Sequence, residues 1–94
     1  MKLVYEIVGG ETYEYYPLGK HVVAAPKVCG GRPTFKHTRL EVKTVLDLMA
    51  SGWTMEKILS EYNQSRLKPE AIREALRLAG DALLKVGSAE KLIA

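Results

Sequence analysis

The sequence is poor in groups that carry out chemistry. Its 94 residues include one cysteine, Cys29, so an intrachain disulfide is excluded and no Cys-x-x-Cys pair is available for zinc. The other reactive groups are the tyrosines and two histidines, His21 and His37. Their spacing fits neither a metal site nor a nucleophile–base–acid triad. We therefore expect no catalytic residue, no metal ligand, no cofactor and no enzymatic activity.

Long apolar runs are also missing. No segment approaches the roughly 18 to 20 consecutive apolar residues of a membrane span. The apolar run at the N-terminus is broken by Glu6, unlike that of a signal peptide. We therefore expect a cytoplasmic protein without a membrane partner. The hydrophobic share of 47% and the charged share of 27% are typical of a soluble globular chain. One domain over residues 1–94 is expected, small enough to gain stability from a partner subunit.

Acidic residues are absent from residues 15–40, although this stretch holds five lysines and arginines. The first 40 residues carry six basic and three acidic side chains, whereas residues 41–94 carry eight of each. The net charge of +3 is thus concentrated in the first part of the chain. This distribution fits an anionic partner and an ordinary solvated surface about equally well, and both interpretations stay open.

The first 29 residues are expected to form a β-rich arm. Residues 2–8 and 11–16 are rich in strand-forming side chains and flank Gly9-Gly10. Two glycines suit a type I′ turn, so the pattern predicts a β-hairpin. Residues 21–25 predict a further short strand. Exposed tyrosines on a hairpin suit strand addition or dimer pairing, which makes three residues a candidate partner interface: Tyr13, Tyr15 and Tyr16.

Residues 30–40 predict a basic joint between the strands and the helices, because they combine Gly30-Gly31 and Pro33 with several cations. The joint and one later loop supply the candidate nucleic-acid-binding residues: Arg32, Lys36, His37, Arg39 and Lys68. The start of the next helix has two interpretations. Either Thr38 caps it and Glu41 completes a capping box, or the chain stays extended to Leu40 and the helix starts at Glu41.

From residue 41 the apolar spacing changes to the period of a helix. The first predicted helix ends at Ser51-Gly52, Thr54 caps the second, and the third runs from Pro69 to about Lys85. A short tail helix over residues 88–92 is also predicted. The fold class is therefore α+β. An N-terminal β-hairpin plus a short strand is followed by a trihelical, helix-turn-helix-like bundle over residues 41–94.

The third predicted helix has two distinct faces. Its apolar stripe consists of Ile72, Ala75, Leu76, Ala79 and Leu83. Its outward residues alternate in charge and predict three surface ion pairs: Glu70–Arg73, Glu74–Arg77 and Arg77–Asp81. A helix face that reads DNA keeps its cations free for phosphates and base edges. We therefore expect any nucleic acid to contact the joint, with Lys68, rather than this helix alone.

Five short motifs occur in order between His21 and Leu83. They are Gly30-Gly31-Arg32-Pro33, Thr38-Arg39-Leu40, Ser51-Gly52-Trp53-Thr54, Glu61-Tyr62 and Pro69-Glu70-Ala71-Ile72-Arg73. Together they resemble the domain-of-unknown-function family 433. The resemblance implies a homeodomain-like trihelical fold and a VapB-type, antitoxin-like role with a PIN-type ribonuclease toxin as partner.

The sequence departs from the family pattern in two places. His37 stands where the family has a glycine, which matters if that position needs a positive φ. The loop between Tyr62 and Pro69 is longer than in the family pattern. Residues 1–19 lie outside the resemblance altogether.

Two function hypotheses from different classes follow. The first is an antitoxin-like protein that binds a PIN-type nuclease and, as a dimer, operator DNA. The second is a protein-interaction or structural dimerisation module without a nucleic-acid role, which uses the tyrosines and Trp53 as contact surface. Under either hypothesis we expect a homodimer that pairs through the N-terminal hairpin.

Overall fold

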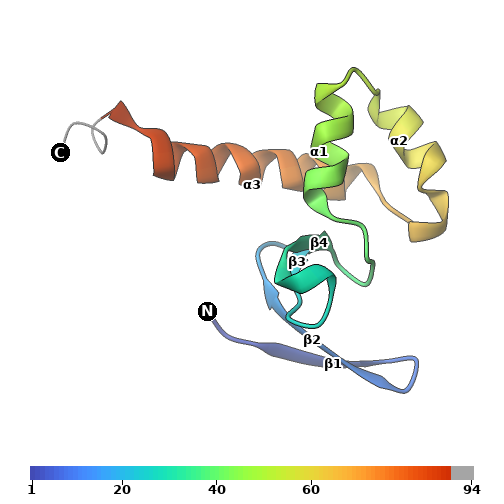
Figure 1. Cartoon of the computed structure of the whole chain (residues 1–94). Coiled ribbons are helices and arrows are strands. Elements are labelled where there is room, and N and C mark those ends of the chain that lie inside the picture. The colour runs from blue at the N-terminus through green and yellow to red at the C-terminus, as the bar shows by residue number, and fades with distance from the viewer. Residues whose placement is uncertain (90–94) are drawn as a thin grey trace.

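A computed structural model describes residues 1–89 as a four-stranded antiparallel sheet followed by three helices, which confirms the α+β class (Figure 1). The strands lie side by side in chain order: β1 (Val4–Val8), β2 (Glu11–Pro17), β3 (Val22–Ala24) and β4 (Pro33–Phe35). The helices are α1 (Val42–Ala50), α2 (Met55–Glu61) and α3 (Pro69–Gly87), with single 3₁₀ turns at Cys29–Gly31 and Asn63–Ser65. Most of the predicted tail helix over residues 88–92 lies outside the described residues.

The predicted hairpin is confirmed. Gly9 and Gly10 have φ of +58° and +82°, the two positive values that a type I′ turn requires. Val4 pairs with Tyr15 and Glu6 pairs with Tyr13, so these four side chains share one face of the hairpin. The opposite face carries Tyr5, which is exposed. The hairpin therefore turns its charged and aromatic face toward the rest of the chain.

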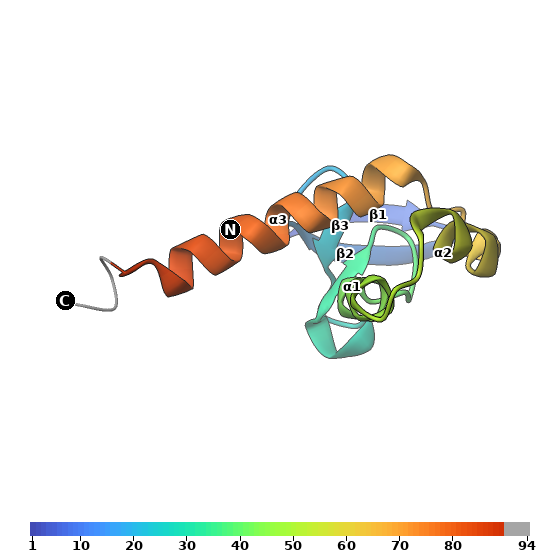
Figure 2. The ribbon, with the colours of Figure 1, turned by 90° about the horizontal axis from the view of Figure 1, so that it is seen from above.

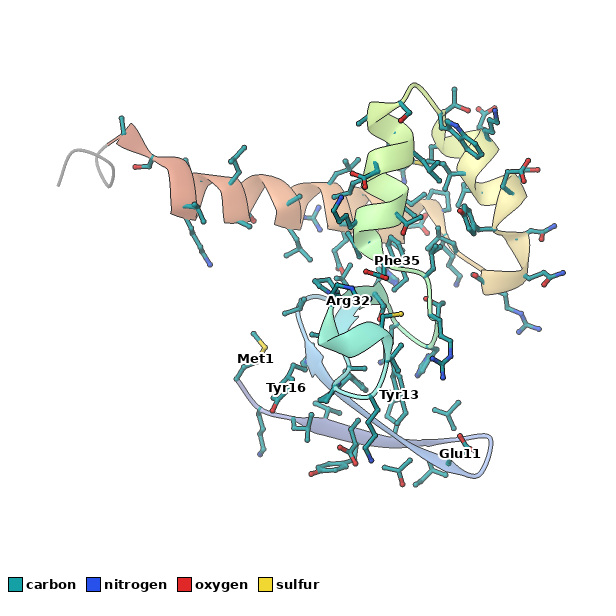
Figure 3. The ribbon with its side chains drawn as sticks, in the orientation of Figure 1. Met1, Glu11, Tyr13, Tyr16, Arg32 and Phe35 are labelled. Carbon is teal, nitrogen blue, oxygen red and sulfur yellow. The ribbon has the colours of Figure 1, made fainter. Side chains whose placement is uncertain are left out.

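The central strand β3 separates two apolar clusters, because successive side chains of a strand point to opposite faces. Val22 joins Phe35 in the main core, where α1, α2 and α3 supply Val45, Ile58 and Ile72. Figure 3 shows Phe35 between the sheet and the helices. Val23 joins the smaller cluster on the hairpin side, with Tyr15 and Ala25.

The predicted joint is part of the sheet rather than a connector beside it. It contains β4, and Thr34 forms a further bridge with Glu41. Of the two interpretations of the helix start, the capping box is wrong. The Thr38 hydroxyl donates to the Phe35 carbonyl at 2.7 Å and accepts from the Leu40 N–H at 3.1 Å, so it closes a turn ahead of the helix. The chain stays extended, and α1 begins directly after Glu41.

The ends of the other helices agree with the sequence. The Thr54 hydroxyl accepts from the Lys57 N–H at 3.1 Å and caps α2 as predicted. Gly52 has a φ of +99°, which suits its place just past α1. Pro69 is the first residue of α3, where its missing N–H is not needed.

Helix α3 differs from the prediction on both faces. Ile72 and Ala75 are buried, but Leu76 and Leu83 are 41% and 72% exposed, and Leu83 lies on the C-terminal half of the helix, which extends beyond the rest of the molecule (Figures 1 and 2). Of the three predicted ion pairs, only Glu70–Arg73 forms within the described residues, at 4.0 Å. Glu74 was placed on the solvent face, and this is wrong, since its carboxylate is buried against the turn that precedes β3.

Candidate nucleic-acid interface

The carboxylate of Glu74 holds the start of β3 against α3. It accepts from the backbone N–H groups of Lys20 at 3.0 Å, His21 at 2.6 Å and Val22 at 3.1 Å. Burial raises the pKa of Glu74, but these backbone hydrogen bonds outweigh it and hold the pKa below its ordinary value. Gly19 leaves room for the carboxylate, because a Cβ there would lie 2.5 Å from Glu74 Oε1. This contact fixes the position of His21 relative to the first turns of α3.

A small hollow of about 140 Å³ lies between the end of β4 and the turn that leads into α3. We call it the basic hollow, because its lining includes Lys36, Arg66, Lys68 and His21 and no acidic residue. Thr38 and Ser65 add two hydroxyl groups to the lining. The cations come from segments about thirty residues apart in the chain, so the fold itself brings them together. Their charge and the available donors suit a single anionic group.

Lys36 is held at one side of this hollow by the hairpin. Its ammonium lies 3.5 Å from Glu6 and 5.0 Å from the centre of the Tyr15 ring. Contact with the Tyr15 side chain, together with the charge of Glu6, raises the pKa of Lys36 above its ordinary value. Lys36 therefore stays charged, although Glu6 balances part of its field.

Arg66 is the residue that sequence reasoning missed. It follows the 3₁₀ turn Asn63–Ser65 and has a φ of +54°, a left-handed conformation that is unfavourable for a side chain with a Cβ. It is exposed, and within the described residues it pairs with no acid. The signal available in the sequence was the pair of cations, Arg66 and Lys68, just before the helix-starting Pro69.

His37 faces the hairpin instead of this hollow. Its φ of +64° explains why the family pattern has glycine at this position. Its N–H donates to the Tyr13 hydroxyl at 3.1 Å, and its ring Nε2 lies 3.3 Å from Glu6. Contact with the Tyr15 side chain and the charges of Lys36 and His37 lower the pKa of Glu6. His37 thus links the segment after β4 to β1 and β2.

The other two predicted cations are also elsewhere. Arg32 forms a two-pronged ion pair with Glu41, at 2.7 and 3.2 Å. This hydrogen bonding raises the pKa of Arg32 and lowers the pKa of Glu41, and both line a separate groove beside α1. Arg39 is exposed and pairs with no acid among the described residues, while its carbonyl accepts from the Cys29 thiol at 3.3 Å. The structure therefore groups Lys36 with Lys68 and leaves Arg32, His37 and Arg39 outside the basic hollow.

The three predicted interface tyrosines have different surroundings. Tyr15 is only 5% exposed and belongs to the smaller core, so the assumption that it is exposed is wrong. Tyr13 is partly buried and points from β2 toward the segment after β4 (Figure 3). Tyr16 is partly buried and pairs with Ala24. The exposed aromatic residue of the hairpin is Tyr5, on its outer face.

The described residues, 1–89, also bear on the kind of site. They contain no group of three or more His, Cys, Asp or Glu side chains placed to hold a metal ion. None of their helices is long and apolar enough to cross a membrane.

Comparison with known families agrees with the motifs. Residues 22–79 match the model of the family described as protein of unknown function, DUF433. The match includes β3, β4, all of α1 and α2 and the first half of α3, and it leaves out the hairpin. No curated protein and no solved structure shows significant similarity to the chain.

Proposed function

The chain belongs to the DUF433 family of proteins of unknown function, and we propose that it is an antitoxin-like protein that binds a PIN-type nuclease and, as a dimer, the phosphate backbone of operator DNA. Its role is binding, without catalysis. The observation that carries the DNA half is the basic hollow, which Lys36, Arg66 and Lys68 line without a carboxylate, with the Lys36 ammonium on the hairpin side, 3.5 Å from Glu6. The nuclease half rests on the resemblance of the motifs described above.

A helix-turn-helix-like unit is part of the proposal. Each of the three helices packs against the other two, and α1 and α2 are joined by a short turn, residues 51–54. The N-terminus of α3 lies at the basic hollow, through Lys68 and Ala71. The positive end of the helix dipole therefore adds to the field of the cations there. A DNA phosphate in the hollow would interact with both, and such contacts orient a protein on the duplex without reading its sequence.

The DNA half is tested by measuring affinity for duplex DNA as a function of salt concentration. The test variant is Arg66→Ala with Lys68→Ala, because both side chains line the hollow and are exposed. The matched control is Lys2→Ala with Lys27→Ala, which removes the same charge from two exposed side chains that line neither the hollow nor the groove beside α1. Fluorescence anisotropy of a labelled duplex reports the dissociation constant of each variant.

We expect the affinity of the hollow variant for duplex DNA to fall about 10-fold at low salt. The slope of log affinity against log salt is expected to become shallower by about 1.8, since the variant loses two phosphate contacts and each contributes about 0.9. The control changes the long-range field alone, so its slope stays within about 0.5 of the unmodified protein. Equal losses in the two variants would mean that net charge, and not the hollow, attracts DNA. No salt-sensitive binding at all would remove the DNA half.

The nuclease half needs a separate experiment. Co-expression with a PIN-type nuclease encoded beside this chain is expected to give a co-purifying complex in which RNA cleavage is suppressed. The variant with Arg66→Ala and Lys68→Ala is expected to suppress cleavage as well as the unmodified chain does, because the hollow is proposed to hold DNA phosphate. A nuclease that stays free and active contradicts this half only.

One observation supports the alternative of an interaction module without a nucleic-acid role. Strand β1 is the edge of the sheet, and its outer face exposes Tyr5 and Ile7. An exposed edge with apolar side chains suits pairing with another chain. DNA binding that is absent at low salt, together with a stable protein complex, would favour this alternative.

A further inference from the structure

From Leu76 onward, α3 has an apolar face that none of the other described residues, 1–89, covers. Leu76, Ala79, Leu83 and Val86 recur at alternating spacings of three and four, so they share one face of the helix. The face continues from the buried Ile72 and then leaves the body of the molecule, as Figures 1 and 2 show from two directions. We call residues 76–87 the α3 arm. A helical segment of this length is marginal in water without packing on one face.

A groove lies directly beside this arm. It has a volume of about 730 Å³ and runs between the arm, α1 and the start of β3, where Leu18, Val42, Leu46 and Leu78 line it. We call it the apolar groove. On its rim Arg32 pairs with Glu41 at 2.7 Å and Lys43 pairs with Asp47 at 2.7 Å, and the arm adds one acidic and one basic side chain, Asp81 and Lys85, so acidic and basic side chains of the lining are equal in number. The surroundings therefore favour an uncharged, apolar occupant.

We propose that the α3 arm of a second copy of this chain occupies the apolar groove, while the first arm occupies the groove of that copy. An interface between two identical copies related by a two-fold axis requires one self-complementary surface. The arm and the groove meet this condition, because Ala79 and Ala82 line the groove and also lie on the exposed arm. An antiparallel crossing near these alanines places each overhanging arm over the body of the partner.

The shape and charge of the surface favour a second copy over an unrelated peptide. One symmetric association places two arms in two grooves at once, which buries twice the apolar area of a single arm in a single groove. The small side chains at Ala75, Ala79 and Ala82 let two helices approach closely. The molecule measures 50 × 34 × 20 Å, an elongation to which the arm contributes. Antiparallel pairing would enclose that arm.

The proposed pairing through α3 differs from a dimer that pairs through the hairpin. Two neighbouring leucines on α3 allow a matched test of the α3 interface. Leu83 and Leu84 are 72% and 69% exposed, so an aspartate at either position leaves the fold of the single chain intact. They point about 100° apart around the helix, and only Leu83 lies on the apolar face of the arm. Ile7→Asp, on the outer face of the hairpin and 74% exposed, tests the hairpin as the interface.

Sedimentation velocity of the full chain over a wide concentration range provides the readout, with circular dichroism to check folding. We expect a dimer for the unmodified chain, for Leu84→Asp and for Ile7→Asp. Leu83→Asp is expected to raise the dimer dissociation constant at least about 100-fold, because symmetry buries the new charge twice. A monomeric unmodified chain, a dimeric Leu83→Asp, or an equal effect of Leu84→Asp or Ile7→Asp would overturn the proposal.

A cross-link keeps the test decisive if Leu83→Asp fails to fold. In a Cys29→Ser background, Ala82→Cys is expected to form a disulfide-linked dimer on oxidation, whereas Ser60→Cys, exposed on α2, remains monomeric under the same conditions. Equal or absent cross-linking at the two positions contradicts the geometry. The inference rests on the proposed function in one respect, because it specifies the interface of the proposed dimer. Its readout is molecular mass, whereas the proposed function is tested by DNA and nuclease binding. Either result can therefore be negative while the other is positive.

Discussion

Replacement of Glu74 by glutamine is the most informative perturbation of the fold. One carboxylate accepts from three backbone N–H groups, and the donors are 52 to 54 residues away in the chain. Glutamine keeps the shape of the side chain and one acceptor oxygen. Its amide group must face one of the three N–H groups, so a donor there opposes a donor. The substitution therefore removes one hydrogen bond and the negative charge and leaves the packing unchanged.

The expected loss of stability follows from those contacts. A hydrogen bond to a charged group contributes about 1.5 to 3 kcal/mol, whereas one to a neutral group contributes about 1 kcal/mol. The N–H groups of Lys20 and His21 are partly buried, so water can replace part of their loss, while the Val22 bond is fully buried. We therefore expect Glu74→Gln to lower the free energy of unfolding by about 2 kcal/mol. For a domain of this size that corresponds to a decrease in Tm of roughly 8 to 16 °C.

Thermal unfolding followed by circular dichroism at one fixed protein concentration measures this loss. Glu70→Gln is the matched control, because it removes the same charge from the same helix at a side chain that is 62% exposed and 4.0 Å from Arg73. Its effect is expected to stay within about 0.5 kcal/mol. If Glu74→Gln and Glu70→Gln have the same Tm, the carboxylate does not hold β3 in the way described.

The pH dependence supplies a second check with a defined sign. The pKa of Glu74 is lower in the folded chain than in the unfolded one, so its contribution is fully present above the unfolded value of about 4.3. It is lost as the pH falls through the folded pKa. Glu6 and Glu41 also have lowered pKa values, but both proteins contain them. The Tm difference between the unmodified chain and Glu74→Gln should therefore shrink below about pH 4.

Two further substitutions test backbone strain and a buried hydroxyl. His37→Gly is expected to change the free energy of unfolding by less than about 1 kcal/mol, because relief of the strain of the positive φ offsets the lost ring contacts. His37→Val loses the same contacts but keeps the strain. In urea unfolding it is therefore expected to be less stable than His37→Gly by at least about 1.5 kcal/mol. Equal stability of the two variants would refute the role of φ. Thr34→Val is expected to raise stability by about 1 kcal/mol, since the fully buried Thr34 hydroxyl makes no hydrogen bond within the described residues. A destabilised Thr34→Val would show that the hydroxyl has a partner after all.

The sequence predicted those features that a few neighbouring residues determine. Gly9-Gly10 favours a type I′ turn, because both glycines tolerate a positive φ. The Thr54 hydroxyl can accept a hydrogen bond from the N–H three residues later and so caps a helix. Pro69 lacks an N–H and therefore fits the first residue of a helix but not its interior. Each of these rules acts within one turn of chain, so no tertiary contact was needed to apply it. The positive φ of His37 was raised as a condition by the family pattern, which has glycine at this position, and the structure shows a φ of +64° there.

Periodicity predicted which residues share a face but not what covers it. Alternating charges on α3 suggested a solvent face, and Glu74 was included because Arg77 lies three residues later. Its partners are backbone N–H groups of a distant turn, and a backbone group leaves no residue-type signal in the sequence. The same limit applies to the basic hollow. Lys36 and Arg66 line one hollow only because β4 and the turn before α3 pack against one core.

The hairpin lies outside the family match, yet the matched segment depends on it. Val23 is fully buried, and the side chain that covers it from the hairpin side is Tyr15 of β2. The Lys36 ammonium is held by Tyr15 and by Glu6 of β1. Glu74 lies within the match, while its donors Lys20 and His21 precede it. A fragment of residues 22–79 would therefore expose Val23 and release Lys36, so anion binding by the basic hollow has to be measured on the full chain.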